Sequence, residues 1–419
     1  MAHKKLFRPT SLLAALSLSL LAACSHEAPN KQAEAAAVRW PAVLVHLHAS
    51  QGAFLVDPAT DQVVANIKTF PGANLGATTP DGRKIYLGAE AEGQRTVTVI
   101  DLERKEVVKR IETGNRPKHP AASPYGRYVL VNHWGLDNNK LRVSFIDTRT
   151  DSIVKNIDLD VAGQAKGPTS MHNAWSYDSR YAFTLDRVDD YLIVVDTRDW
   201  STRKIKTPSK PHYAVPSPDG KELWLVVEGA DKDRNRPGAL VFDLTKPELP
   251  LLAKVDMPLQ NQGVLEGHHG NFTQDGKHFY ILNRGPGSKA EGNEIAVFDT
   301  RSKQLVTRID TGSTGIGHTY NTPDGKYAVV TNYGNNKLSI VDAKSFKLVK
   351  DITIGKGRMG HVAFTPDSRW AYASNAGDGN LHKIDLKTLE LVKEVKTGNA
   401  SGGAQVLNVW TNVFEELPR

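Results

Sequence analysis

Residues 145–157 read FIDTRTDSIVKNI: a short apolar run ends at Asp147, a polar turn follows, and a second run with apolar residues begins. The same pattern recurs as VIDLERKEVVKRI at 99–111, VFDTRSKQLVTRI at 297–309 and IVDAKSFKLVKDI at 340–352. Eight such aspartates align, at Asp57, Asp101, Asp147, Asp196, Asp243, Asp299, Asp342 and Asp385. They are spaced by 43 to 56 residues, which is the length of a four-stranded blade. The repeat therefore predicts a β-propeller.

A second repeat lies inside the first and marks seven hairpins, as in SPDGKELWL at 217–225 and TPDGKYAVV at 322–330. Proline followed by Asp-Gly suits a tight turn between two strands. The first unit, 42–69, has no such hairpin and lacks an innermost strand, which GGAQVLNVW at 402–410 can supply. This pairing would close the ring and remove two exposed sheet edges.

We therefore predict an all-β chain with a single β-propeller over residues 39–412. It has eight four-stranded blades and is closed by pairing of its N- and C-terminal strands. Seven blades, with residues 40–70 folded otherwise, is the alternative.

The N-terminus carries an export signal. Lys4, Lys5 and Arg8 precede an apolar stretch that is too short to span a membrane, and Leu21-Ala22-Ala23-Cys24 follows. This ending resembles the lipobox of bacterial lipoproteins, which implies a signal peptide over 1–23, a lipid on Cys24 and a flexible tether over 24–38. We expect a protein anchored to a membrane on the periplasmic side, with the outer membrane favoured. A plain signal peptide with an incidental cysteine is the alternative.

Composition narrows the remaining chemistry. Cys24 is the only cysteine, so the chain can form neither an internal disulfide nor a thiolate metal site. The formal net charge is +7, of which Lys4, Lys5 and Arg8 of the predicted signal carry three; the remaining charge of about +4 is spread over the repeats without a basic block, so we do not expect nucleic acid as a partner.

Histidines are the one feature beyond the architecture. In five hairpins a histidine stands four residues before the turn Ser or Thr, and in a sixth it stands five before. The innermost strand of each blade begins there, so these imidazoles are predicted to face one axis. They are His119, His172, His212, His269, His318 and His361. Further candidates at the same mouth are His48, His133, His268 and Glu266.

Converging neutral imidazoles are typical of a metal site, and without thiolates copper or zinc are the expected ions, copper being favoured by the affinity order. Glu266 would orient a neighbouring imidazole. A pocket for a small organic ligand or substrate, and histidines that serve packing alone, are the alternatives. The sequence contains no GxSxG, HExxH or CxxCH motif, and it leaves open whether the protein is an enzyme.

The segments VVTNYGNNKLSIVD at 329–342 and YASNAGDGNLHKID at 372–385 resemble the repeat of the YVTN-type propeller family. This resemblance covers roughly residues 40–410 and implies the fold. Relatives of that family include the haem-d propeller of nitrite reductases, and nitrous oxide reductase is similar in having a histidine-lined propeller that holds copper. Two further hypotheses follow: a propeller that binds a haem-d-type tetrapyrrole, and a scaffold for another envelope protein with structural histidines.

Overall fold

The computed structural model describes residues 43–69, 72–73, 75–229, 236–258, 266–285, 292–398 and 403–409. The chain divides into two units, Met1–Arg39 and Trp40–Arg419, and the described residues all belong to the second. The predicted signal peptide, Cys24 and the tether lie outside them. In the part of the chain that the structure describes, no helix has the length and apolarity needed to cross a membrane.

The described strands form eight antiparallel sheets of four strands each, which we number as blades 1 to 8. From the centre outwards, blade 1 contains β32 (Gly403–Val409), β1 (Val43–His48), β2 (Gly52–Asp57) and β3 (Gln62–Ile67), and blade 2 contains β4 (Gly76–Thr78), β5 (Lys84–Leu87), β6 (Thr96–Asp101) and β7 (Glu106–Glu112). Blade 3 contains β8 (Pro117–Ala122), β9 (Tyr128–His133), β10 (Lys140–Asp147) and β11 (Ser152–Asp160). Blade 4 contains β12 (Ala174–Trp175), β13 (Tyr181–Asp186), β14 (Tyr191–Asp196) and β15 (Thr202–Lys206). Blade 5 contains β16 (Pro211–Pro216), β17 (Glu222–Val227), β18 (Gly238–Asp243) and β19 (Leu251–Asp256), and blade 6 contains β20 (Gly267–Phe272), β21 (His278–Asn283), β22 (Glu294–Asp299) and β23 (Leu305–Asp310). Blade 7 contains β24 (Ile316–Asn321), β25 (Tyr327–Asn332), β26 (Lys337–Asp342) and β27 (Leu348–Thr353). Blade 8 contains β28 (Met359–Phe364), β29 (Trp370–Asn375), β30 (Leu381–Asp385) and β31 (Glu390–Val395).

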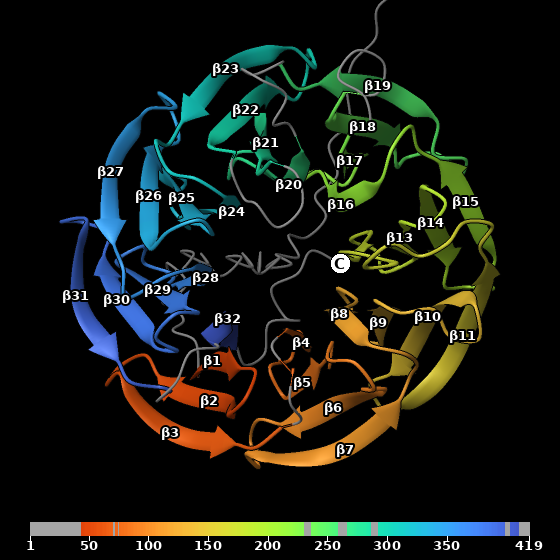
Figure 1. The fold of residues 1–419 in the computed structure, drawn as a ribbon, viewed down its shortest axis with the longest axis horizontal. Helices are drawn as coiled ribbons and strands as arrows, with labels where there is room; N and C mark the ends of the chain where they lie inside the picture. Colours follow the sequence, from red (N-terminus) through yellow and green to blue (C-terminus); the bar gives the residue numbers. More distant parts are fainter. Residues whose placement is uncertain are drawn as a thin grey trace, which may run out of the picture. The chain divides into compact units, whose positions relative to one another are not determined.

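The blades stand around one axis, with the first strand of each nearest the centre and the fourth on the rim (Figure 1). The eight-bladed prediction is confirmed. Blade 1 takes its innermost strand from the other end of the chain, because β32 pairs antiparallel with β1, with Leu44 opposite Asn408 and Val45 opposite Leu407. The predicted closure by N- and C-terminal strands is therefore also confirmed.

The aspartate of each repeat ends the third strand and shapes the turn that follows. Asp147 accepts a hydrogen bond from the backbone N–H of Arg149 at 2.8 Å, and Asp385 accepts one from Lys387 at the same distance. A short carboxylate satisfies the backbone donors of a tight turn in this way. The repeated aspartates thus have a structural role, as the sequence indicated.

The core lies between neighbouring blades. Trp224 on β17 of blade 5 is fully buried against Phe272 and Phe279 of blade 6. The second and third strands of a blade, such as β17, β18, β25 and β26, are almost entirely buried, whereas outer strands such as β31 expose most of their residues. Packing between sheets therefore holds the ring together.

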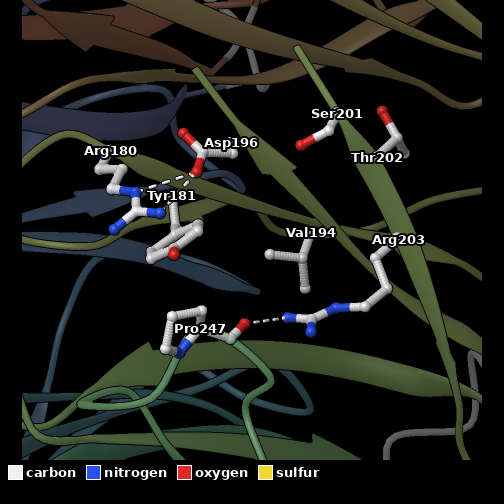
Figure 2. A pocket seen from close by; sticks show the side chains of 8 residues that line it. All are labelled: Arg180, Tyr181, Val194, Asp196, Ser201, Thr202, Arg203 and Pro247. Atoms are coloured by element: carbon white, nitrogen blue, oxygen red, sulfur yellow. Dashed lines mark hydrogen bonds and ion pairs between the residues drawn. The ribbon is translucent and has the colours of Figure 1, made fainter. Parts of the chain in front are cut away.

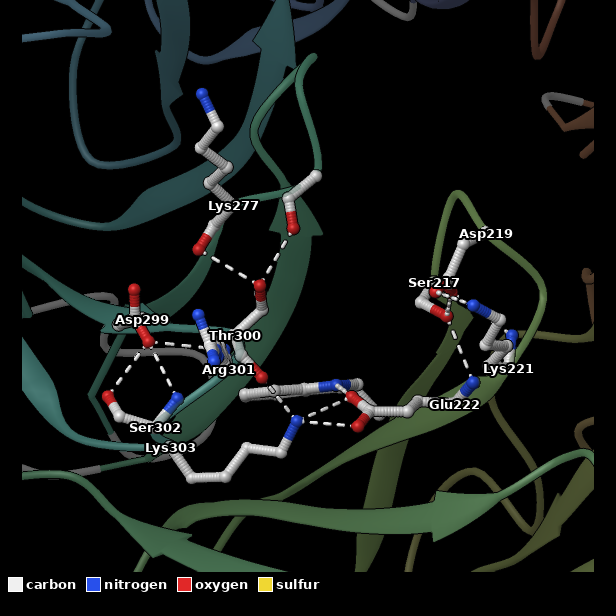
Figure 3. A network of polar contacts seen from close by, with 12 residues as sticks. Ser217, Asp219, Lys221, Glu222, Lys277, Asp299, Thr300, Arg301, Ser302 and Lys303 are labelled. Carbon is white, nitrogen blue, oxygen red and sulfur yellow. Dashed lines mark hydrogen bonds and ion pairs between the residues drawn. The ribbon is translucent and has the colours of Figure 1, made fainter.

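Towards the rim, ion pairs of one kind link blades 2 and 3, through Lys84 and Asp151, and blades 5 and 6. The turn before the outer strand of one blade reaches the second strand of the preceding blade, as Figure 3 shows for Lys303 and Glu222, whose Nζ and Oε1 atoms are 2.6 Å apart. Glu222 also accepts a hydrogen bond from the Trp224 indole at 2.8 Å. Asp61 of blade 1 forms an ion pair with Lys383 on the third strand of blade 8 and accepts a hydrogen bond from Tyr372 on its second strand, so polar contacts of the turn also span the closure.

Asp196 lies at a small cavity of about 220 Å³ between blades 4 and 5 (Figure 2). Its carboxylate accepts hydrogen bonds from Arg180 at 2.9 Å and from Arg198 at 3.0 Å. Burial acts to raise the pKa of Asp196, but the hydrogen bonds from Arg198 and Arg180 outweigh burial and lower this pKa to about 2. The charged carboxylate therefore stabilises the fold above the pKa of the unfolded chain, ~3.9.

We expect Asp196→Asn to lower the free energy of unfolding at neutral pH by about 1.5–3 kcal/mol, the range for hydrogen bonds to a charged group. The loss should shrink as the pH falls from ~4 towards 2, since the wild-type carboxylate is protonated there. Urea unfolding of both proteins at several pH values measures it. The exposed Glu103→Gln serves as control, and a difference that stays constant with pH would contradict the assignment.

Candidate functional site

The innermost strands carry an irregularity where the sequence places the histidines. The register shifts at Lys118–Ala121 in β8, at Pro211–Tyr213 in β16, at 267–270 in β20, at 316–319 in β24 and at 359–362 in β28. A β-bulge leaves a residue out of the ladder and redirects its side chain. The bulges thus turn the histidines out of the sheets.

The backbone N–H groups released by two of these bulges find hydroxyl partners. The N–H of His318 donates to Thr331 Oγ1 at 3.1 Å, and the N–H of His361 donates to Ser374 Oγ at 2.8 Å. Both hydroxyls lie on the second strand of the same blade. The irregular backbone is therefore stabilised locally, and the imidazoles are held in place.

The six predicted ring histidines converge at the centre, together with His268. Distances between ring centroids are 4.2 Å for His119–His172, 4.6 Å for His172–His269, 3.9 Å for His269–His318, 4.5 Å for His318–His361 and 4.0 Å for His212–His268. Blades 3 to 8 each contribute at least one of these rings. The structure thus brings together residues that lie up to 242 positions apart in the chain.

Two adjoining cavities lie among these rings. The larger has a volume of about 380 Å³, and all seven histidines line it together with Leu75, Glu90, Lys118, Trp134, Met171, Arg284, Tyr333 and Arg358. The smaller has a volume of about 250 Å³ and is lined by four of the histidines with Tyr213, Tyr320 and Gln405, among others. The walls combine imidazoles, aromatic rings and cations.

Burial lowers the pKa of every imidazole in this cluster. The pKa of His361 falls to about 3, and those of His119, His172, His268, His269 and His318 lie well below the ordinary value. Repulsion from neighbouring imidazoles and cations adds to the effect of burial. At neutral pH the rings are uncharged, so each offers a lone pair to a ligand.

Three cations face the larger cavity. Burial and the nearby Arg358 lower the pKa of Lys118 to about 7, and Lys118 forms an ion pair with Glu90. The guanidinium groups of Arg284 and Arg358 lie 5.5 and 4.1 Å from the ring centroid of Tyr333. Because Glu90 is paired with Lys118, the guanidinium groups of Arg284 and Arg358 leave the wall with positive charge, and the cavity favours an anionic ligand.

Two carboxylates lie close to His212. Glu228 Oε1 lies 2.7 Å from His212 Nδ1 and also pairs with Arg187. Glu266, the acidic residue singled out in the sequence, lies with a carboxylate oxygen within 4.8 Å of ligand atoms of both His212 and Glu228. Glu266 therefore stands near the cluster, as the sequence predicted.

The structure places His48 and His133 elsewhere. His133 Nδ1 donates a hydrogen bond to the carbonyl oxygen of Arg142 at 2.9 Å, and its Nε2 lies 3.2 Å from Thr113 Oγ1. His48 contacts Ser50 and is fully buried. Both end the second strand of their blade, β1 and β9; because side chains alternate along a strand, the residue that follows His133 lines the larger cavity instead.

Trp134, immediately after His133, shows this alternation, and so do Arg284 and Tyr333 at the equivalent places after β21 and β25. The sequence did not single out Trp134, Tyr320 or Glu90 as site residues. Tyr320 has a signal that could have found it, since it lies two residues after His318 on the same strand and so on the same side. Its hydroxyl lies 2.8 Å from His361 Nδ1.

A comparison with protein families gives one match. Residues 127–332 match the family model of the cytochrome D1 heme domain. The matched cytochrome D1 segment is just under half of the chain and runs from β9 to β25, so it includes His172, His212, His269 and His318. It favours the tetrapyrrole hypothesis over the copper hypothesis, which no comparison supports. A search of curated protein sequences finds no match.

Solved structures are similar in fold. The dihydro-heme d1 dehydrogenase NirN, solved in complex with DHE, has a TM-score of 0.70 at 19% identity over 88% of this chain and 76% of its own. The periplasmic gluconolactonase PpgL of Pseudomonas aeruginosa has a TM-score of 0.57 at 17% identity over 88% and 99%. Hydrazine synthase of Kuenenia stuttgartiensis also has 0.57 at 17% identity, over 77% and 98%. At these identities the likeness concerns the fold.

Proposed function

We propose that the central cavity binds a carboxylated iron tetrapyrrole of the haem d1 type. The observation that carries this proposal is the meeting of neutral imidazoles with Lys118, Arg284 and Arg358 at one cavity, in a propeller of which residues 127–332 match the cytochrome D1 heme domain. Imidazole is a common axial ligand of haem iron, and cations bind carboxylates.

The residues present fit such a group. Several buried nitrogen atoms of the cavity wall have no hydrogen-bond partner among the described residues: His119 Nδ1, His212 Nε2 and Trp134 Nε1. Unpartnered buried donors and acceptors are costly, so they indicate a ligand in the functional state. The larger cavity, of about 380 Å³, lies within the range of ~300–1,000 Å³ that small-molecule and cofactor sites have, and the cavity of about 250 Å³ adjoins it.

Each part of the wall has a role in this proposal. An imidazole from the cluster would bind the iron, and Lys118, Arg284 and Arg358 would bind the carboxylates. The rings of Tyr333 and Trp134 offer flat apolar contact and exclude water. When bound, the iron tetrapyrrole supplies redox chemistry and a coordination position for a small molecule.

We further propose that the protein works at the periplasmic face of the envelope, tethered by a lipid on Cys24. The N-terminal sequence supports this location. Export would place the propeller in a compartment where the absence of any second cysteine avoids unwanted disulfides. Labelling of growing cells with radioactive palmitate, compared between the wild type and Cys24→Ser, tests the lipid directly.

Titration of the purified full chain with haem d1, followed by absorption spectroscopy, tests tetrapyrrole binding. We expect a shifted Soret band that saturates at one equivalent. Each of the seven cavity histidines is also replaced singly by glutamine. Only the replacement of the histidine that binds the iron should shift the Soret band. His278→Gln, a histidine of β21 that packs on Phe346, is the matched control. An unchanged haem spectrum on addition of the protein would overturn the proposal.

A further inference from the structure

Three of the cavity histidines form a closer group than the rest. His172, His212 and His269 come from three successive blades, and each offers a nitrogen atom that lies within 4.8 Å of those of the other two. The Nε2 atoms of His172 and His269 are 2.8 Å apart. Two nitrogen lone pairs cannot face each other at this distance without a proton or a cation between them, and a metal ion can replace that proton.

His212 of this group also has the carboxylate partner that is typical of metal-binding histidines. Glu228 accepts a hydrogen bond from His212 Nδ1 at 2.7 Å, and Arg187 holds Glu228. With its proton on Nδ1, His212 carries its lone pair on Nε2, which is buried and has no partner among the described residues. A carboxylate that orients a histidine in this way is the usual outer partner of a metal ligand.

We propose that His172, His212 and His269 bind one divalent transition-metal ion, copper(II) or zinc, with a fourth coordination position open, and that Glu228 is the positioning residue for His212. Three imidazoles and an open position are the ligand set of catalytic zinc sites, and imidazole also suits copper(II). For metal–nitrogen distances of ~2.0–2.1 Å, the Nε2 atoms of His172 and His269 must separate by about 0.5 Å.

This ion is held by the protein and is distinct from any iron within a tetrapyrrole. It engages three of the seven histidines, so His119, His318 and His361, which line both cavities, stay available to an iron tetrapyrrole beside the cations of the larger cavity. The inference does not rest on the proposed function, because the contacts that carry it lie between protein groups alone.

Cobalt(II), which substitutes for zinc and absorbs visible light, is the probe. The full chain is treated with a chelator, freed of any tetrapyrrole and titrated with cobalt(II), and zinc is then measured by competition. We expect one ion per chain with the absorption of a tetrahedral site. The double variant His172→Gln, His269→Gln should bind at least 100-fold more weakly, and His278→Gln should bind as the wild type does.

Glu228→Gln tests the positioning role and guards against a double variant that fails to fold. It should weaken binding about 10- to 100-fold while the stoichiometry stays at one, the effect typical of lost outer partners. Cobalt absorption that is absent from the wild type, or that is equal in all variants with intact circular dichroism, overturns the inference. A protein that binds haem d1 but no cobalt refutes this site and leaves the proposed function standing. A protein that binds cobalt but not haem d1 supports this site and overturns the proposed function.

Discussion

A chain that ends at residue 402 is expected to unfold or aggregate, because it lacks β32. This strand supplies the innermost position of blade 1 through a ladder with β1. Val406 is buried in a cluster with Leu44 of blade 1 and Tyr372 of blade 8, and Gln405 accepts a hydrogen bond from the backbone N–H of Gly76 in blade 2 at 2.8 Å. One strand therefore ties three blades together.

Without β32, the edge of β1 and the inner face of blade 8 are exposed, and exposed sheet edges promote aggregation. We expect the loss of most of the ~5–15 kcal/mol that stabilises a typical domain. Thermal unfolding followed by circular dichroism measures the effect. A chain that lacks only residues 410–419 is the matched control and should keep its melting temperature.

The point variant Val406→Asp probes the same closure without shortening the chain. A buried charge without a partner costs about 3–5 kcal/mol. A truncated chain or a Val406→Asp variant that melts within a few degrees of the wild type would contradict the account of closure.

The second large effect is expected in ligand binding. Replacing Arg284 and Arg358 together by glutamine should weaken tetrapyrrole binding by ~100-fold or more, since each hydrogen bond to a charged group is worth about 1.5–3 kcal/mol. Both guanidinium groups line the larger cavity beside Tyr333. The dissociation constant from the absorption titration measures the loss, and the wild-type affinity should also fall with rising salt.

Arg83→Gln is the matched control for this pair of substitutions. Arg83 follows β4, its side chain is 68% exposed, and it lines neither cavity of the described site. Its replacement should leave the affinity unchanged. Since Arg284 also contacts His268, the melting temperature of the double variant has to be compared with that of the wild type. Equal affinities for wild type and double variant would show that the cations do not hold the ligand.

The seven central histidines illustrate how far a repeat carries a prediction. Five were found from one spacing and His212 from a spacing one residue longer, because the innermost strands of successive blades begin at corresponding places around the axis. The same reasoning misplaced His48 and His133. An alignment that is off by one residue moves a strand side chain to the other face, and Trp134 occupies the place expected for His133.

The choice of ligand could not be read from those spacings. A histidine that binds a metal ion and one that binds haem iron are the same residue in a sequence. The difference lies in what stands beside them: Glu228 behind His212, Arg284 beside His268, and Tyr333 between two guanidinium groups. Glu228 and Arg284 lie in the same hairpins as the histidines that they contact, but Arg284, Tyr333 and Arg358 come from three blades, and no local pattern records that these three meet.

The sequence by itself determined the eight blades and the turns at the repeated aspartates, because these depend on alternation and spacing within about fifty residues, and it indicated the closing strand because the first unit lacks an innermost strand. Only the tertiary structure decided which side chains share the central cavity, how burial keeps its imidazoles neutral, and that His172, His212 and His269 stand within reach of one ion. These three features depend on the curvature of the ring, which sets the distances between residues that are remote in the chain.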